Sequence, residues 1–311
     1  MIKSRCGAAE WSLFMYKPMR FWGTSAGAIL PSPFCRCRSC ENARKVGGKE
    51  VRLRSAFRID RKTMIDIGQD YAAQAARLAD EWFDVENFII THTHSDHFNP
   101  LLLWVRWDAA LVGPKKPITI YLTEDAYRTL DEFLYTTPAL IDKNAEYMSE
   151  KSVIFKKLAF HETADIGGHR VTPLRGVHNT VFEKNSANYM IDLADGRRMY
   201  YALDSGYYSD ETFEYLKGKH LDILIGECTF PGEYGMNFCP VHMNVTTTIA
   251  TFDRLWENKT IDENTDIYLT HIGDNGMTHK ELQAYFAELD RPYHVKIAYD
   301  GLSVDEAYEE A

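Results

Sequence analysis

Four side chains that commonly bind metal ions lie within six consecutive residues: His92, His94, Asp96 and His97. They follow a short apolar run at residues 88–91, which we expect to form a buried β-strand. Residues two apart on an extended segment point to the same side, so His92 and His94 face one point. The turning chain can present Asp96 and His97 to a neighbouring point. Because three of the chain's 11 histidines fall in this one turn, the pattern predicts two adjacent metal sites rather than a solvated loop.

Three more residues with metal-binding side chains occur in a similar setting, at or just past the end of an expected strand: His178, Asp204 and His271. Taken singly, each residue is more often a structural polar side chain than a ligand. Together with the first motif they favour a dimetal site, because two ions roughly 4 Å apart need a bridging ligand and further imidazoles.

The cysteines are unevenly distributed along the chain. Cys35, Cys37 and Cys40 crowd into six positions, whereas the other cysteines are scattered at positions 6, 228 and 239. Six cysteines in this arrangement do not form a disulfide framework. The Cys-x-Cys-x-x-Cys spacing places three thiolates close enough to share one tetrahedral ion, so a zinc site is favoured over three reduced buried thiols.

Length and composition limit the class of protein. The chain has 311 residues, of which 45% are hydrophobic and 13% aromatic, which excludes disorder, collagen and coiled coil. Lys+Arg number 35 against 45 Asp+Glu, for a net charge of -10, so binding of a long polyanion would require a local basic patch and nucleic acid is not expected as a partner. No apolar run approaches the roughly 18 residues of a membrane span, and residues 1–17 lack a secretory pattern. We therefore expect a cytoplasmic protein without membrane partners.

Strands and helices are expected in both halves of the chain. Residues 55–60 and 63–68 are typical of a hairpin, and helices are expected over residues 71–82 and 247–257. Further strands are expected at 21–27, 118–122, 171–174, 188–193, 198–203, 223–225, 267–270 and 295–299. This order fits two sheets packed face to face and covered by helices, in one α/β domain at 19–305 with an extension at 1–18 and a tail at 306–311. The tyrosine-containing region between 97 and 153 fits a pocket wall or the surface of a homodimer.

The order of the candidate ligands resembles that of the metallo-β-lactamase-fold hydrolases: an HxHxDH motif, a lone histidine, a lone aspartate and a final histidine. The resemblance implies a four-layer αββα sandwich that holds two metal ions. By this resemblance one metal is held by His92, His94 and His178, the other by Asp96, His97 and His271, with Asp204 as the bridge. Asp96 is also expected to be a catalytic residue. Asp66 matches the family's Asp-x-Gly strand end, where it either orients the ligands or is an ordinary turn residue.

A narrower resemblance covers residues 19–303. Five short motifs carry it: Gly23-Thr24-Ser25, Cys35-Arg36-Cys37-Arg38-Ser39-Cys40, His242-Met243-Asn244, Thr270-His271-Ile272-Gly273 and Tyr299-Asp300-Gly301. In this order they are similar to the phosphoribosyl cyclic phosphodiesterases of the carbon-phosphorus lyase pathway.

This narrower resemblance assigns two further roles. It implies that the cysteines bind a structural zinc ion together with a histidine three residues after His271, a position that is Asp274 here. The fourth ligand is then Asp274, His279 or a water molecule. It also implies that His242 protonates the leaving oxygen; the alternative is a surface residue at a helix start.

The expected function is hydrolysis of a small or cyclic phosphodiester, of ribose or nucleotide type, to a phosphomonoester. Two zinc or manganese ions would make hydroxide available near neutral pH. The residues that select the substrate are expected within 121–147. The alternatives are an RNA-processing nuclease, a lactonase or β-lactamase, a non-hydrolytic cofactor-biosynthesis protein, and a protein with one structural ion at the cysteines.

Overall fold

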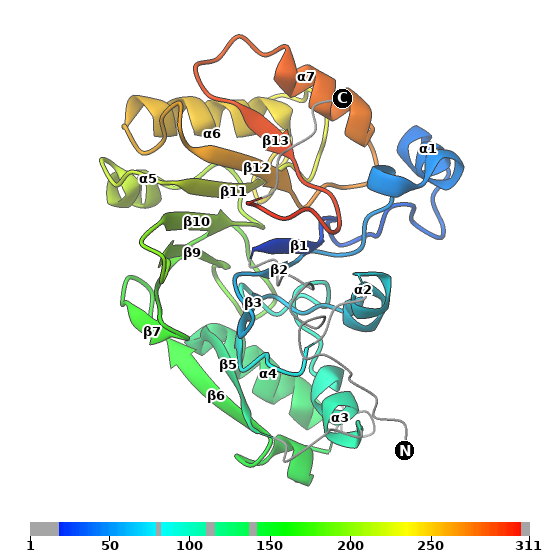
Figure 1. Cartoon of the computed structure of the whole chain (residues 1–311), viewed down its shortest axis with the longest axis vertical. Helices are drawn as coiled ribbons and strands as arrows, with labels where there is room; N and C mark the ends of the chain where they lie inside the picture. Colours follow the sequence, from blue (N-terminus) through cyan, green and yellow to red (C-terminus); the bar gives the residue numbers. More distant parts are fainter. Residues whose placement is uncertain (1–18, 79–81, 110–115, 137–141, 306–311) are drawn as a thin grey trace, which may run out of the picture.

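Two β-sheets pack face to face at the centre of the protein, and helices cover their outer faces (Figure 1). The computed structural model describes residues 19–78, 82–109, 116–136 and 142–305; the expected extension at 1–18 and tail at 306–311 lie outside them. The expected αββα sandwich is confirmed. Within the described residues, no helix has the length and apolar character that crossing a bilayer requires.

The first sheet has six strands in chain order: β1 (Arg20–Gly23), β2 (Ala56–Arg58), β3 (Thr63–Ile65), β4 (Asn87–Ile89), β5 (Ile118–Thr123) and β6 (Val153–Leu158). The pairs β1–β2 and β2–β3 are antiparallel, whereas β3 to β6 run parallel. The carboxyl ends of β3 and β4 therefore lie side by side, and the chain leaves both at the same edge of the sheet.

The second sheet has seven strands: β7 (Ala164–Ile166), β8 (His169–Arg175), β9 (Ala187–Asp192), β10 (Arg198–Ala202), β11 (Ile223–Glu227), β12 (Asp266–Thr270) and β13 (Val295–Ile297). Strands β7 to β10 are antiparallel to their neighbours in sequence, and β10 to β13 are parallel. The carboxyl ends of β10, β11 and β12 again share one edge.

Apolar side chains fill three layers. Residues of both sheets, such as Phe57, Ile89 and Tyr201, form the core between them. A second cluster lies between the first sheet and α2 (Tyr71–Leu78), α3 (Leu101–Asp108) and α4 (Glu124–Thr136). A third lies between the second sheet and α5 (Asp210–Leu216), α6 (Val245–Glu257) and α7 (His279–Ala287). The remaining helical segments are α1 (Arg38–Val46), η2 (Gly48–Glu50) and η3 (Glu146–Met148).

Most expected elements are present, with shifted ends. Helix α6 begins at Val245, two residues earlier than expected, because the Asn244 side chain accepts a hydrogen bond from the Thr247 amide and caps the helix. Helix α2 ends at Leu78, and the rest of that expected helix includes residues outside the described part. The strands β6 and β7 and the helices α1, α5 and α7 were not predicted. They are short or lie at sheet edges, so they lack the long apolar periodicity that sequence patterns detect.

Candidate metal centre and active site

The candidate site lies at the edge where the parallel strands of both sheets end. Asp66 directly follows β3, the HxHxDH motif follows β4, and Asp204 and His271 follow β10 and β12. Three of these residues have left-handed backbone angles, with φ of 58° at Asp66, 47° at Asp204 and 53° at His271. Such angles are unfavourable for residues other than glycine and recur at functional sites, so each strand stops abruptly to aim a polar side chain at the shared edge.

The first group of candidate ligands contains His92, His94, His178 and Asp204, whose ligand atoms lie within 4.8 Å of one another. His94 Nδ1 is 3.0 Å from His92 Nε2 and 3.1 Å from His178 Nε2. His92 Nε2 is 3.1 Å from Asp204 Oδ2. Three imidazole nitrogens and a carboxylate oxygen thus converge, which is a donor set that suits zinc.

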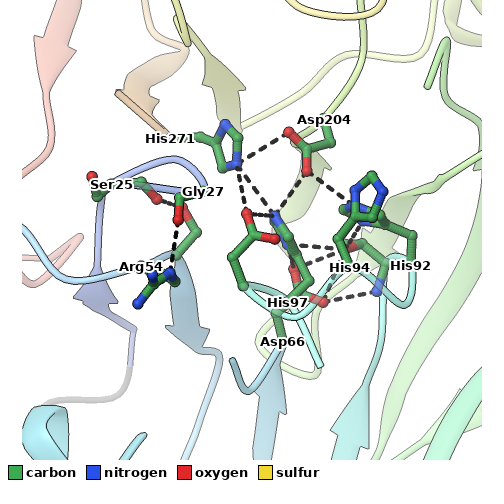
Figure 2. A network of polar contacts seen from close by, with 12 residues as sticks. Ser25, Gly27, Arg54, Asp66, His92, His94, His97, Asp204 and His271 are labelled. Atoms are coloured by element: carbon green, nitrogen blue, oxygen red, sulfur yellow. Dashed lines mark hydrogen bonds and ion pairs between the residues drawn. The ribbon is translucent and has the colours of Figure 1, made fainter. Parts of the chain in front are cut away.

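The second group contains Asp96, His97, Asp204 and His271, with the same mutual spacing of at most 4.8 Å. His97 Nε2 is 3.2 Å from His271 Nε2, 2.8 Å from Asp204 Oδ2 and 3.3 Å from Asp96 Oδ2. Figure 2 shows His97, Asp204 and His271 pointing toward one another. Asp204 belongs to both groups, in the position that the resemblance assigned to a bridge.

Several histidines of the two groups have a hydrogen-bond partner on the ring nitrogen that faces away from the centre. His97 Nδ1 lies 2.6 Å from Asp66 Oδ2, and His178 Nδ1 lies 3.3 Å from the Val241 carbonyl oxygen. The Thr229 hydroxyl lies 2.8 Å from His271 Nδ1. Such partners fix the ring orientation of metal-binding histidines. The residues present therefore fit two divalent cations.

Charge at the site favours cations. Burial lowers the pKa of His178 to about 3 and also lowers the pKa of His94, so both rings are neutral and offer a lone pair. At His97 burial opposes protonation, but Asp204 and Asp96 outweigh it and raise the pKa of the ring. The pKa values of Asp96 and Asp204 are lowered by neighbouring histidines despite burial. A largely dehydrated pair of carboxylates thus attracts positive charge, from a proton or a metal ion.

The Asp-x-Gly strand end has a physical explanation. Asp66 is fully buried, and its Oδ1 accepts a 2.8 Å hydrogen bond from the amide of Thr91, next to His92. A Cβ atom added to Gly68 would lie 2.0 Å from the carbonyl oxygen of Asp96, so only glycine admits this approach. Asp66 thus lies where the resemblance placed an orienting residue, behind the ligand loop rather than in a free turn.

His242 lies beside the second group. Its Nδ1 is 3.2 Å from Asp204 Oδ1 and 3.4 Å from Glu227 Oε1. Burial opposes protonation of the ring, but Glu227 and Asp204 outweigh it and raise the pKa of His242 to about 11. The two carboxylates thus favour the protonated form of the ring.

Sequence reasoning missed two buried acids that organise the site. Glu227 ends β11 and accepts hydrogen bonds from the amides of Ser205 and Thr229, at 2.6 and 3.3 Å. Its place at a strand end is a signal that could have identified it. Glu183 accepts from the amide of Thr93, at 3.0 Å, and from the Thr93 hydroxyl, so it supports the loop between two ligands. It lies 90 positions from Thr93, and no local pattern marks it.

The three clustered cysteines form a third group with Asp274, again within 4.8 Å. The Cys37 thiol lies 2.7 Å from the Asp274 carbonyl oxygen, and Cys40 Sγ is 3.8 Å from Asp274 Oδ2. His279 is not part of the group: Arg52 lies 2.8 Å from its Nδ1, and burial lowers its pKa to about 3. Of the side chains considered as fourth ligand, the structure brings Asp274 to the cysteines.

The remaining cysteines lie elsewhere. Cys228 is buried and Cys239 is partly buried, and neither belongs to a group of candidate ligands. Cys6 lies outside the described residues.

Comparisons with known proteins agree with this fold. The beta-lactamase superfamily domain matches residues 61–272, more than half of the chain, so the protein belongs to this superfamily. The matched stretch contains the HxHxDH motif, His178, Asp204 and His271. No curated protein sequence matches the chain.

Several solved structures share the architecture. A diphosphatase of the PhnP family has a TM-score of 0.67 at 21% identity, covering 91% of this chain and 95% of that one. Zinc-bound PqqB from Methylobacterium extorquens has a TM-score of 0.68 at 18% identity, covering 91% and 98%. The short form of human tRNase Z has a TM-score of 0.60 at 18% identity, covering 91% and 97%. At these identities the likeness shows the metallo-β-lactamase fold.

Proposed function

We propose that the protein is a dimetal-dependent phosphodiesterase that converts a small or cyclic phosphodiester into a phosphomonoester. The observation that carries this proposal is the pair of ligand groups joined at Asp204, with His242 Nδ1 3.2 Å from Asp204 Oδ1. Two of the similar structures support it, the diphosphatase of the PhnP family and the human tRNase Z. The short motifs that resemble phosphoribosyl cyclic phosphodiesterases extend it to a ribose or nucleotide diester.

Two divalent cations, zinc or manganese, are assigned to the two groups. His92, His94 and His178 hold one and Asp96, His97 and His271 the other, with Asp204 between them. Bound there, the cations supply Lewis acidity toward phosphoryl oxygens and lower the pKa of water, so that a nucleophile forms near neutral pH. Asp96 and Asp204 orient the centre and balance its positive charge.

His242 is assigned the proton donor to the departing oxygen. An alkoxide is a poor leaving group, so a proton delivered during cleavage of the P–O bond lowers the barrier. Glu227 Oε1, 3.4 Å from His242 Nδ1, keeps the imidazolium oriented and charged until the proton moves from the ring to the alkoxide oxygen. Glu227 is thus a positioning residue, because it acts through His242.

The cysteine group is assigned one structural zinc ion, with Asp274 as the fourth ligand. Amide groups point at two of the sulfur atoms: Ser32 N is 3.3 Å from Cys40 Sγ and Cys37 N is 3.4 Å from Cys35 Sγ. Amide donors of this kind stabilise thiolates, the form that binds zinc.

The decisive experiment is hydrolysis of bis(p-nitrophenyl) phosphate by metal-loaded protein beside the Asp96→Ala variant. A p-nitrophenyl monoester and a lactone serve as control substrates. Diester turnover that is lost in the variant, with little monoester or lactone turnover, supports the proposal. Absence of diester turnover at full metal occupancy would contradict the proposed phosphodiesterase activity. Lactone turnover would then indicate a lactonase, and no turnover of any substrate would indicate a non-hydrolytic protein.

A further inference from the structure

A cavity of about 450 Å³ lies beside the candidate metal centre, between the ligand loop and the helices α3 and α4. Thr93 and Ser95 line it, and they flank His94 in the sequence. His94 is also the exposed member of its ligand group. The cavity therefore adjoins the loop that carries His94, the exposed candidate ligand, and its volume is in the range of small-molecule sites.

The cavity wall is apolar with a few neutral polar groups. Phe98 and Phe133 contribute aromatic rings, and Phe133 is 37% exposed. Gln69 and Asn99 contribute amide groups, which can both donate and accept hydrogen bonds. Such a lining suits a planar group with apolar faces and polar edges.

The described residues that line the cavity include no lysine, arginine or histidine. Among the described lining residues a second phosphate would meet neutral hydrogen-bond donors but no positive charge to balance its own, which is unfavourable. The lining therefore distinguishes between the two kinds of diester that the proposed function allows. It favours a neutral aromatic substituent and disfavours a further phosphorylated sugar.

We propose that this cavity binds the substituent of the diester that stays on the phosphorus, and that this substituent is an uncharged aromatic group the size of a nucleobase. The inference rests on the proposed function and makes its substrate class more specific: a nucleoside phosphodiester. Phe133 is its main specificity-determining residue, because it lies on α4, whereas Phe98, the other aromatic side chain in the wall, is buried and directly follows the candidate ligand His97.

A second aromatic surface of the protein is an alternative binding site for the aromatic substituent. Phe238 is 50% exposed, stacks on Tyr234 at 4.2 Å between ring centroids and contacts Phe230, which lies near His242. This surface is on the side of the proton donor, where the departing group leaves. It therefore serves as the matched comparison for the cavity.

The test uses two substrates with the same leaving group, methyl 4-nitrophenyl phosphate and thymidine 5′-(4-nitrophenyl phosphate). Because both release 4-nitrophenolate, differences in KM report the group that remains. We expect the nucleoside ester to have a KM about tenfold lower than the methyl ester, as base stacking on an aromatic side chain would provide. Phe133→Ala should remove this KM advantage of the nucleoside ester, and Phe133→Leu should retain part of it.

Equal KM values for the two esters in the unmodified protein would overturn the inference while leaving the phosphodiesterase intact. So would a loss of the advantage in Phe238→Ala but not in Phe133→Ala. If neither ester is hydrolysed, the proposed function fails. Calorimetry then tests separately whether the cavity binds an aromatic group. If thymidine 5′-monophosphate binds more tightly than methyl phosphate, and Phe133→Ala abolishes the difference, the cavity binds the aromatic group as proposed. Equal binding of the two compounds would overturn the inference.

Discussion

The His/Asp centre and the cysteine group are assembled in different ways. The centre gathers ligands from strand ends and loops between residues 92 and 271, in both sheets of the sandwich. The cysteine group takes three members from six consecutive residues at the start of α1 and adds Asp274. The first depends on the whole fold, whereas the second is mostly local.

This difference indicates different roles. Ligands of the centre are held from behind by buried partners such as Asp66 and Thr229, so their geometry is rigid before any ion binds. The cysteine group instead connects α1 to the loop after His271, where the Ser39 hydroxyl also donates to the Gly276 carbonyl at 2.9 Å. We therefore expect changes at the centre to affect chemistry, and changes at the cysteines to affect stability.

The largest effect is expected at Asp204. Replacement Asp204→Asn keeps the shape but removes the charge shared by both ligand groups, so kcat for bis(p-nitrophenyl) phosphate should fall about 10²–10³-fold. Metal analysis should show loss of ions from the centre and retention at the cysteines. Asp195→Asn, which alters a partly exposed carboxylate bound to Arg197, is the matched control. Full activity in Asp204→Asn would contradict the shared role.

For Cys40→Ser we expect the opposite result, a loss of stability with little change in activity. Loss of one thiolate should remove the structural ion and lower stability by about 2–3 kcal/mol, or roughly 5 °C in Tm. The kcat of the folded fraction should change less than about twofold, because Cys40 is not a ligand of the centre. Thermal unfolding with metal analysis tests this, with Cys239→Ser as the control. An unchanged Tm and metal content would exclude a structural ion.

A smaller effect is expected at Asp66, which contacts the centre through His97. Asp66→Asn should weaken metal binding to the second group about 10–100-fold, the usual cost of losing a partner behind a metal-binding histidine. Metal titration followed by calorimetry measures it, and excess metal should restore much of kcat. Unaltered affinity would mean that Asp66 only shapes the turn.

The smallest effect concerns the ion pair between Arg38 of α1 and Glu281 of α7. The hydrogen bond from Arg38 and the Thr278 amide lower the pKa of Glu281 to about 2 from an ordinary 4.5. The folded form therefore gains stability from ionised Glu281 above pH 4.5 and loses it as the pH falls toward 2. Because the pair is exposed, Glu281→Gln should cost only about 0.5 kcal/mol at pH 7. Urea unfolding should show a smaller stability difference between the unmodified protein and Glu281→Gln at pH 2.5 than at pH 7. A difference that stays constant or grows would contradict this prediction.

Some strands and helices could be predicted from the sequence, and others could not. Buried strands such as β11 and β12 have apolar central residues and were expected close to their observed bounds. Strand β6 was missed because it pairs only with β5 at the sheet edge, so its middle residues are half-buried or exposed and show no clear pattern. Helix α5 has seven residues, too few for helical periodicity to stand out.

The site shows the same division between local and long-range information. The types and close spacing of His92, His94, Asp96 and His97 are local, so the sequence alone determined that they are candidate ligands, as it did for Cys35, Cys37 and Cys40. His178, Asp204 and His271 joined the set because each lies at or just past the end of an expected strand, and the family resemblance then assigned each of them to a metal.

The tertiary structure alone decided which residues meet. Glu227 and Glu183 became part of the site because strand pairing and sheet packing bring them to His242 and Thr93, across 15 and 90 positions. The choice of Asp274 over His279 beside the cysteines was likewise made by packing, since Arg52 lies against the His279 ring. Spacing along the chain restricts only the geometry of near neighbours, whereas contacts between distant residues depend on how the sheets and helices pack.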